Sequence, residues 1–364
     1  MSRPLLAQVN LSALRANLRK ARESAANAQV LAVVKADAYG HGLERVLPAL
    51  SEADGLALLE LNAAVALRER HYTRRILLLE GFFTADELQE IAARRFAVVV
   101  HHEDQVRMLE SAELPRPIEV FVKINTGMNR LGFRPDLTHA IVDRLSHASS
   151  VAVLRLMTHL ARADEKEGPR EQLERFEEAC EGLPYPRSLA NSAGVLRYAE
   201  IGGDYVRPGI MLYGSSPFPY ETAEMLDLVP VMTLKSKLIA IQELRANDSV
   251  GYGGIYTASR AHRVGVIACG YADGYPRHAP NGTPVLVCGR KVRTAGRVSM
   301  DMMTVDLTDV PEAVIGSPVV LWGEGLPVDD VAAASSTVGY QLLCGVSRRV
   351  PFVTTEVGKV DLEL

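Results

Sequence analysis

The chain has 364 residues, with 40 Lys and Arg against 44 Asp and Glu and a formal net charge of −4. At roughly 150 residues per domain, this length predicts two domains, or one large barrel with an additional module. Hydrophobic residues make up 48% of the chain, which is typical of a globular protein and argues against a mostly disordered one. The slightly acidic balance argues against nucleic-acid binding, because a phosphate backbone needs a basic surface.

The sequence carries no pattern typical of secretion, membrane insertion or metal binding. No apolar segment of the secretory type follows Met1, and no apolar run reaches the roughly 20 residues that a membrane-spanning helix needs. The cysteines form no C-x-x-C pair, so we expect neither a zinc site nor a redox motif. Isolated cysteines in a chain of this length are typical of reduced thiols, and we therefore expect a cytoplasmic protein. The four cysteines are Cys180, Cys269, Cys288 and Cys344.

Through the first two-thirds of the chain, short apolar runs alternate with segments of helical pattern. The runs are nearly continuous in aliphatic residues, as expected for parallel strands that are buried on both faces. Residues 61–70 and 84–95 have apolar residues at helical spacing, and Thr84 is a candidate N-cap of the second segment. The predicted strands are 30–35, 55–60, 75–80, 96–101, 118–124, 151–159, 187–191 and 204–213.

Eight strands that alternate with helices predict an α/β fold, a (β/α)8 barrel of the TIM type. Such a barrel places its functional residues at the carboxyl ends of the strands. The alternative is a doubly wound open sheet, but no G-x-G-x-x-G motif follows the first strand, as it does in the dinucleotide-binding form of that fold.

The pattern changes beyond about residue 230. Strand-like segments at 264–269, 284–288 and 317–322 are separated by Gly and Pro turns, and a helical pattern returns only at 328–336. This arrangement predicts a mainly β C-terminal domain. The two predicted domains are 1–228 and 229–364.

Lys35 stands at the end of the first predicted strand, within the segment KADAYGHG. A lysine there is often directed to solvent, but the surrounding small residues and glycines allow a ligand to approach closely. A desolvated lysine has a lowered pKa and can form a Schiff base. Ser192, Gly209 and Ile210 follow the last two strands, where this fold commonly binds phosphate. Together they predict a pyridoxal 5'-phosphate (PLP) site; the alternative for Asn191 and Ser192 is an ordinary helix cap.

Arg207 lies next to the predicted phosphate site and is a candidate partner of the cofactor's pyridine nitrogen. An arginine does not give up its proton at ordinary pH. It would therefore leave the ring nitrogen unprotonated, weaken the electron sink and suppress side reactions. The alternative is a salt bridge at the end of the barrel. Lys123 and His159 also lie near the ends of predicted strands and are further candidate site residues.

Seven longer motifs, in order along the chain, carry a family resemblance: AVVKADAYGHG, KINTGMNRLGF, NSAG, DYVRPGIMLYG, VGYGGIYTA, GYADGYPRHAP and GRVSMDMM. With them the chain resembles, from end to end, the bacterial alanine racemases, which are PLP enzymes of fold type III, and more loosely their catabolic form. Several independent motifs in one order are far more specific than any single motif. One departure is Asp37, which stands where the family often has Asn and to which we assign no role.

The resemblance implies the catalytic groups. Lys35 matches the lysine that forms the Schiff base and acts as the base on the D-enantiomer. Tyr271 matches the tyrosine base for the L-enantiomer, which the partner subunit of a homodimer delivers; the alternative is an interface tyrosine satisfied by one hydrogen bond. His159 matches the histidine that orients this tyrosine, and Arg207 matches the partner of the pyridine nitrogen.

The resemblance also implies contacts with the substrate and the cofactor phosphate. Arg130 matches a residue near the substrate carboxylate, and Met300 one whose backbone N–H reaches that carboxylate. Lys123 matches a lysine that is carbamylated in many members. A carbamate would replace the repulsion between Lys123 and Arg130, expected to be two buried cations, by a charge-assisted hydrogen bond; the alternative is a salt bridge to an acid such as Asp136. The implied phosphate contacts are Tyr39, Ser192, Gly209, Ile210 and Tyr340.

The implied activity is an isomerase reaction, the interconversion of L-alanine and D-alanine. It needs two bases because the proton leaves one face of Cα and returns to the other. The resemblance leaves open whether D-alanine is supplied as a peptidoglycan precursor or degraded. The alternatives are a racemase of a larger amino acid, a PLP-dependent decarboxylase and a PLP carrier protein. A decarboxylase would pair the ring nitrogen with an acid instead of Arg207, and a carrier would lack residues 230–364.

Overall fold

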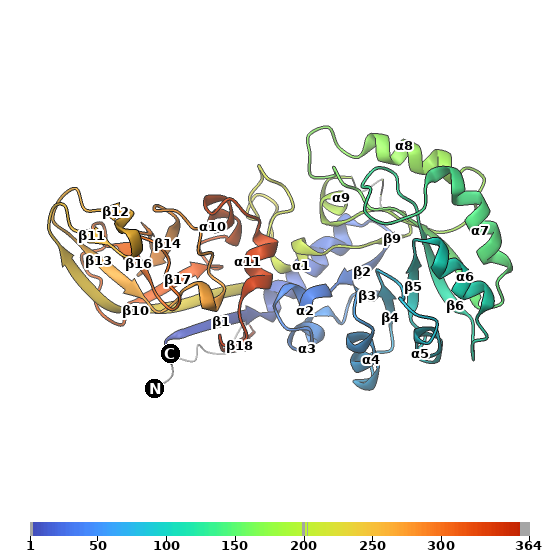
Figure 1. Ribbon diagram of the computed structural model, residues 1–364, viewed down its shortest axis with the longest axis horizontal. Helices are drawn as coiled ribbons and strands as arrows, with labels where there is room; N and C mark the ends of the chain where they lie inside the picture. Colours follow the sequence, from blue (N-terminus) through green and yellow to red (C-terminus); the bar gives the residue numbers. More distant parts are fainter. Residues whose placement is uncertain (1–2, 199–200, 202, 357–364) are drawn as a thin grey trace.

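A computed structural model describes residues 3–198, 201 and 203–356. It consists of a barrel and a second, mainly β part that lie side by side (Figure 1). The barrel is closed by eight parallel strands in sequence order, which confirms the predicted (β/α)8 architecture and excludes the open sheet. Its strands are β2 (Gln29–Val33), β3 (Gly55–Leu58), β4 (Arg75–Leu78), β5 (Ala97–Val100), β6 (Ile118–Lys123), β7 (Val151–Met157), β8 (Arg187–Ser188) and β9 (Tyr205–Val206).

Helices and 3-10 turns connect these strands. The sequence signal for them is amphipathic, with one apolar face toward the barrel; in α6, for example, Val106 and Leu109 are buried. The helical elements of this part are α1 (Leu11–Ser24), α2 (Lys35–Tyr39), α3 (Leu43–Val46), η1 (Leu47–Leu50), α4 (Leu61–Glu69), α5 (Glu87–Ala93), α6 (Glu103–Ser111), η2 (Pro135–Leu137), α7 (Thr138–His147), α8 (Arg170–Ala179), α9 (Ser192–Arg197) and η4 (Ile210–Tyr213).

The strands are buried as their composition predicts, but they are shorter than the apolar runs. Every residue of β3 and β5 is buried, as in parallel strands covered on both faces. β2 ends at Val33 and β7 at Met157. Lys35 and His159 therefore stand just beyond their strands, in the connections at the mouth of the barrel.

The predicted N-cap at Thr84 is wrong. α5 begins at Glu87, and its capping residue Asp86 makes no side-chain cap bond. The Glu87 carboxylate instead accepts the backbone N–H of Phe83 at 2.6 Å and that of Thr84 at 3.3 Å. These bonds satisfy the amides that precede the helix, so a threonine cap is not needed there.

The second part is built on an eight-stranded sheet, which confirms the predicted mainly β domain. It also contains a two-stranded ribbon, two short helices and two 3-10 turns. The sheet strands are β1 (Leu5–Asn10), β10 (Met232–Leu244), β13 (His262–Ile267), β14 (Pro284–Val287), β15 (Arg290–Arg293), β16 (Met303–Asp306), β17 (Pro318–Trp322) and β18 (Phe352–Thr355). The others are β11 (Ser249–Val250), β12 (Tyr256–Thr257), η5 (Tyr252–Gly254), η6 (Tyr271–Asp273), α10 (Val328–Ala334) and α11 (Gly339–Gly345).

The first strand of the chain lies in this second sheet (Figure 1). β1 pairs antiparallel with β10, with Leu5 opposite Ser236, and parallel with β18, with Ala7 opposite Phe352. The chain therefore enters the β part, builds the barrel and returns. The predicted division at residue 228 stays a prediction, and residues 357–364 of the predicted second domain lie outside the described ones.

A buried asparagine joins α1 to the segment that leaves the barrel. The side-chain amide of Asn17 donates to the carbonyls of Leu212 at 3.1 Å and Val229 at 2.8 Å, and its oxygen accepts the Val229 N–H at 2.9 Å. All the hydrogen-bonding groups of a fully buried side chain are thus satisfied by backbone, which specifies one arrangement of the connection.

Among the described residues, no helix is long and apolar enough to cross a membrane.

Candidate active site

A cavity of about 740 Å³ opens at the mouth of the barrel, where the carboxyl ends of the strands converge. Most of the predicted site residues line it, although they are spread over more than 300 positions of sequence. Those that line it are Lys35, Tyr39, Lys123, Arg130, His159, Ser192, Arg207, Gly209, Ile210 and Tyr340. The strand-end rule predicts this meeting for the barrel residues, whereas Tyr340 comes from α11 (Gly339–Gly345) of the β part.

The cavity is rich in positive charge. Burial and the nearby Arg130 guanidinium lower the pKa of Lys35. Burial, followed by the charges of Arg207, Lys123 and Arg130, lowers the pKa of His159 well below its usual range. The histidine is therefore neutral at neutral pH, and its imidazole can donate one hydrogen bond and accept another.

Backbone and hydroxyl oxygens hold the Arg207 side chain in place. Its guanidinium donates to the Thr158 carbonyl at 2.7 Å, to the Leu189 carbonyl at 3.3 Å and to the Ser188 hydroxyl. No carboxylate contacts it among the described residues, so the alternative of a salt bridge at the barrel end is not supported. Burial lowers the pKa of Arg207 to about 10, and the group remains a cation and a hydrogen-bond donor at neutral pH.

Lys123 is buried, whereas Arg130 is exposed at the rim of the cavity. The expectation of two buried cations is thus correct only for the lysine, because Arg130 lies in the loop beyond β6. Burial and the charges of Arg207 and Arg130 lower the pKa of Lys123 to about 8. The alternative of a Lys123–Asp136 salt bridge is wrong: both Asp136 oxygens accept from Arg134 at 3.0 Å.

The segment after Lys35 forms a left-handed turn. Ala36, Asp37, Ala38 and Tyr39 all have φ between +52° and +55°. Each such residue costs roughly 1–2 kcal/mol, since Cβ approaches the following carbonyl. Four successive residues of this kind are retained only where the surroundings impose them, and such strain concentrates at functional sites.

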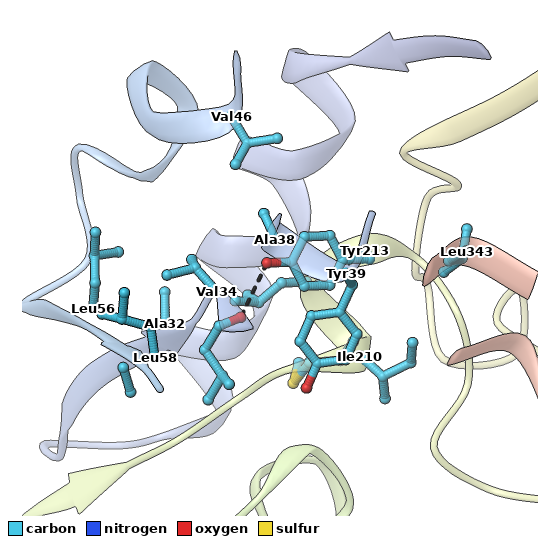
Figure 2. Packing of buried hydrophobic residues seen from close by; sticks show 14 of the residues in the cluster. Ala32, Val34, Ala38, Tyr39, Val46, Leu56, Leu58, Ile210, Tyr213 and Leu343 are labelled. Carbon is cyan, nitrogen blue, oxygen red and sulfur yellow. Dashed lines mark hydrogen bonds between the residues drawn. The ribbon is translucent and has the colours of Figure 1, made fainter. Parts of the chain in front are cut away.

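Several contacts hold this turn. The Asp37 carboxylate, to which we assigned no role, accepts the Leu43 N–H at 2.7 Å. The Tyr39 ring stacks on Tyr213 with centroids 4.6 Å apart, and the Tyr213 hydroxyl donates to the Val33 carbonyl at 3.0 Å (Figure 2). The turn thereby fixes both Lys35 at its start and Tyr39 at its end.

Tyr39, Ser192 and Gly209 form a polar corner of the cavity. The Ser192 hydroxyl oxygen accepts the Gly209 N–H at 2.8 Å, and a Cβ on Gly209 would lie 2.3 Å from the Tyr39 hydroxyl. Glycine is therefore required for this close approach. Burial raises the pKa of Tyr39, so its hydroxyl remains a donor. The Ser192 hydroxyl at the start of α9 and the Tyr39 hydroxyl beside Gly209 fit an anion such as a phosphate.

The helix-cap alternative is confirmed for Asn191 and does not extend to its neighbour. The Asn191 side-chain oxygen accepts the Gly194 N–H at 3.0 Å and so caps α9. Ser192 instead reaches across to the backbone after β9. Two adjacent polar residues thus have different roles, one in the helix and one in the cavity wall.

Tyr271 and Met300 do not line the cavity of the described chain. They lie together in the β part: the Tyr271 N–H donates to the Ser299 carbonyl and the Ala272 N–H to the Met300 carbonyl, both at 3.0 Å. Tyr271 is 36% exposed and Met300 54% exposed. The candidate site is therefore divided between the cavity and this exposed pair.

Sequence reasoning missed three polar residues of the cavity wall: Glu80, His101 and Asp164. Glu80 and His101 are the two that stand at strand ends. They follow β4 and β5, and the ring Nε2 of His101 lies 3.0 Å from the Glu80 carbonyl. Both ended predicted strands, so the rule that selected Lys35 applied equally to them. Glu80 is the acidic group that opposes the lowering of the pKa of both Lys35 and Lys123.

Comparisons with known proteins agree with this arrangement. Residues 9–217 match the family model of the alanine racemase N-terminal domain, and residues 231–354 match that of the C-terminal domain. An alanine racemase of Nitrosospira multiformis is 53% identical over 97% of this chain and all of its own length. A catabolic alanine racemase of Klebsiella aerogenes is 50% identical over the same shares.

Solved structures give the same result. The biosynthetic alanine racemase of Pseudomonas aeruginosa superposes with a TM-score of 0.95 at 47% identity, over 97% of this chain and all of that one. The alanine racemase of Acinetobacter baumannii gives 0.91 at 36% identity, with the same coverage. The fold and the cavity are those of a two-domain barrel enzyme. The chain belongs to the alanine racemase family and is an isomerase.

Proposed function

We propose that this enzyme interconverts L-alanine and D-alanine with PLP bound in the barrel cavity, and that Lys35 and Tyr271 act as its two bases. The observation that carries the proposal is the cavity itself. It joins a lysine of lowered pKa, a polar corner suited to phosphate and a fixed arginine. When bound, PLP would draw electrons away from the substrate Cα and make its proton acidic.

Each residue of the cavity has a distinct task in this proposal. Lys35 would hold the cofactor covalently and move the proton on one face of Cα. Tyr39, Ser192, Gly209, Ile210 and Tyr340 would surround its phosphate. Arg207 would offer only N–H donors to the pyridine nitrogen, which would keep that nitrogen unprotonated and the electron withdrawal moderate.

The second base comes from a second copy of the chain. Tyr271 and Met300 are exposed neighbours on the β part and do not reach the cavity of their own barrel. A twofold dimer in which each β part faces the other barrel would complete two sites at once. In this arrangement the neutral His159 donates a hydrogen bond to the Tyr271 oxygen of the opposite copy and orients this base. Arg130 and the Met300 N–H would bind the substrate carboxylate.

Alanine is the substrate class we favour over larger amino acids. Tyr340 lies in the cavity wall, and Tyr271 approaches it from the other copy, so the two rings leave room only for a small substrate side chain.

The cytoplasmic location, inferred from the four unpaired cysteines, stays a prediction.

Lys35→Ala tests the proposal directly. The wild-type protein, incubated with alanine in deuterated water, should exchange its Cα hydrogen and racemise, and borohydride should fix the cofactor to Lys35. The variant should lose both, because the amine at the start of the left-handed turn is removed. Lys291→Ala, on the exposed hairpin strand β15, is the control. Exchange confined to a larger amino acid, or cofactor fixed to another lysine, would contradict the proposal.

Tyr271→Phe should affect one direction only. Exchange at Cα with retained configuration should be nearly lost from L-alanine and largely kept from D-alanine, since Lys35 still serves the opposite face. Deuterium incorporation into each enantiomer, measured before racemisation, is the readout. Equal losses from both enantiomers would show that the hydroxyl has a structural role instead.

Lys123 should be carbamylated. A pKa of about 8 leaves about half of the amines neutral at pH 8, against roughly 0.3% for an ordinary lysine, and only the neutral amine reacts with carbon dioxide. The carbamate anion would then hold Arg130 by a charge-assisted hydrogen bond. With ¹³C-bicarbonate, a carbamate resonance should appear at pH 8, fade as the pH falls below 7 because the amine becomes protonated, and be absent in Lys123→Met. A bare ammonium at pH 8 would refute this assignment.

A further inference from the structure

One buried carboxylate anchors the turn that carries Tyr271. Asp273 ends η6, its side chain is fully buried, and both of its oxygens are occupied. Oδ1 accepts from Arg3 Nη1 at 2.6 Å and from Arg349 Nε at 2.7 Å; Oδ2 accepts from Arg3 Nη2 and from the Gly270 amide, both at 2.8 Å. Donors from the beginning of the chain, its end and the turn itself thus converge on Asp273.

The same two arginines hold the neighbouring turn. Arg349 Nη2 donates to the Asp301 carboxylate at 2.5 Å, and Arg3 donates to the Asp301 carbonyl. Asp301 directly follows Met300, whose carbonyl already accepts from the residue after Tyr271. Asp273, Asp301, Arg3 and Arg349, here called the clamp, therefore join the Tyr271 and Met300 turns into one unit.

The charges of the clamp balance, because it contains two carboxylates and two guanidinium groups. Burial alone raises the pKa of the Asp273 carboxyl, but the hydrogen bonds from Arg3, Arg349 and Gly270 outweigh burial and bring it below its ordinary value. Asp273 is thus a charged group away from water, and removal of one arginine leaves part of this charge uncompensated.

Within its own chain the Tyr271 side chain has little else to fix it, because the proposed hydrogen bond from His159 of the opposite copy forms only in the dimer. Its hydroxyl has no hydrogen-bond partner among the described residues, and its ring lies 5.8 Å from the Arg277 guanidinium. More than a third of it is exposed. The direction in which the hydroxyl projects therefore depends on the backbone of η6, and so on the clamp.

We propose that Asp273, with Arg3 and Arg349, is a positioning group for the second base. It sets the place of the Tyr271 hydroxyl relative to the Met300 amide, and hence the alignment of the base with a substrate held by that amide. This inference rests on the proposed role of Tyr271. A positioning residue acts through geometry, and displacement of a reacting group by about 1 Å lowers a rate roughly 100-fold.

The test uses Arg349→Gln in the intact holoenzyme. Asp301→Asn is a second variant, because a change at half-exposed Asp301 should disturb folding less than a change at the fully buried Asp273. Both variants should slow the exchange of the Cα hydrogen of L-alanine, with configuration retained, about tenfold or more. They should change the same exchange in D-alanine less than about threefold. Arg349→Lys should recover part of the loss. Arg144→Gln is the matched control: this arginine bridges Glu103 and Glu110 on the outer helices with similar exposure, and it should leave both directions unchanged.

The outcomes separate the two proposals. If Tyr271→Phe shows the directional loss and the clamp variants lose both directions equally, or neither, the positioning role is wrong and the two-base function stands. If Tyr271→Phe shows no directional loss, both are wrong. Directional loss in Tyr271→Phe and in the clamp variants, with little change in Arg144→Gln, supports the inference.

Discussion

The structure depends on the concentration of positive charge at the mouth of the barrel. Lys35, Lys123, Arg130 and Arg207 surround one cavity. Burial, and after it the charges of neighbouring cations, lowers the pKa of Lys35 and of His159 and so favours their neutral forms. The same concentration of positive charge makes the cavity a strong site for anions, which is what a phosphate and an amino-acid carboxylate require. A carbamate at Lys123 would add a negative charge among these cations.

The fold supports this charge by fixing each cation separately. Arg207 is held by two carbonyls and a hydroxyl, and Lys35 begins a left-handed turn that the Tyr39–Tyr213 stack and the Asp37 carboxylate stabilise. α11 packs against the same turn, since a Cβ on Gly40 would lie 2.2 Å from the Leu343 carbonyl. The β part thus contacts the barrel next to the proposed cofactor lysine, and strain in the turn is offset by packing from both parts.

Local sequence patterns predicted the barrel and the position of the cavity at its mouth. They did not predict the features that depend on contacts between distant parts of the chain. The eight apolar runs and the polar residues at their ends predicted that Lys35, Lys123, His159 and Arg207 meet at one mouth of the barrel. Tyr39, Arg130 and Tyr340 came from the family resemblance, and Glu80 and His101 were missed although the same strand-end rule applies to them. β1 could not be predicted, because its partners Ser236 and Phe352 lie more than 200 residues away. The left-handed turn is formed by Ala, Asp and Tyr without a glycine, so no residue signals it. The clamp joins Arg3 to Arg349 and is equally invisible to a local pattern.

The central claim is that one copy of the chain supplies the cavity and another supplies Tyr271. It can be tested most directly by mixing two inactive variants, Lys35→Ala and Tyr271→Phe, after subunit exchange has been verified with two different affinity tags. In a random mixture, half of the dimers are heterodimers, and each has one site with both bases intact, so about a quarter of the wild-type activity should return. Activity no higher than that of the separate variants would show that both bases belong to the same chain.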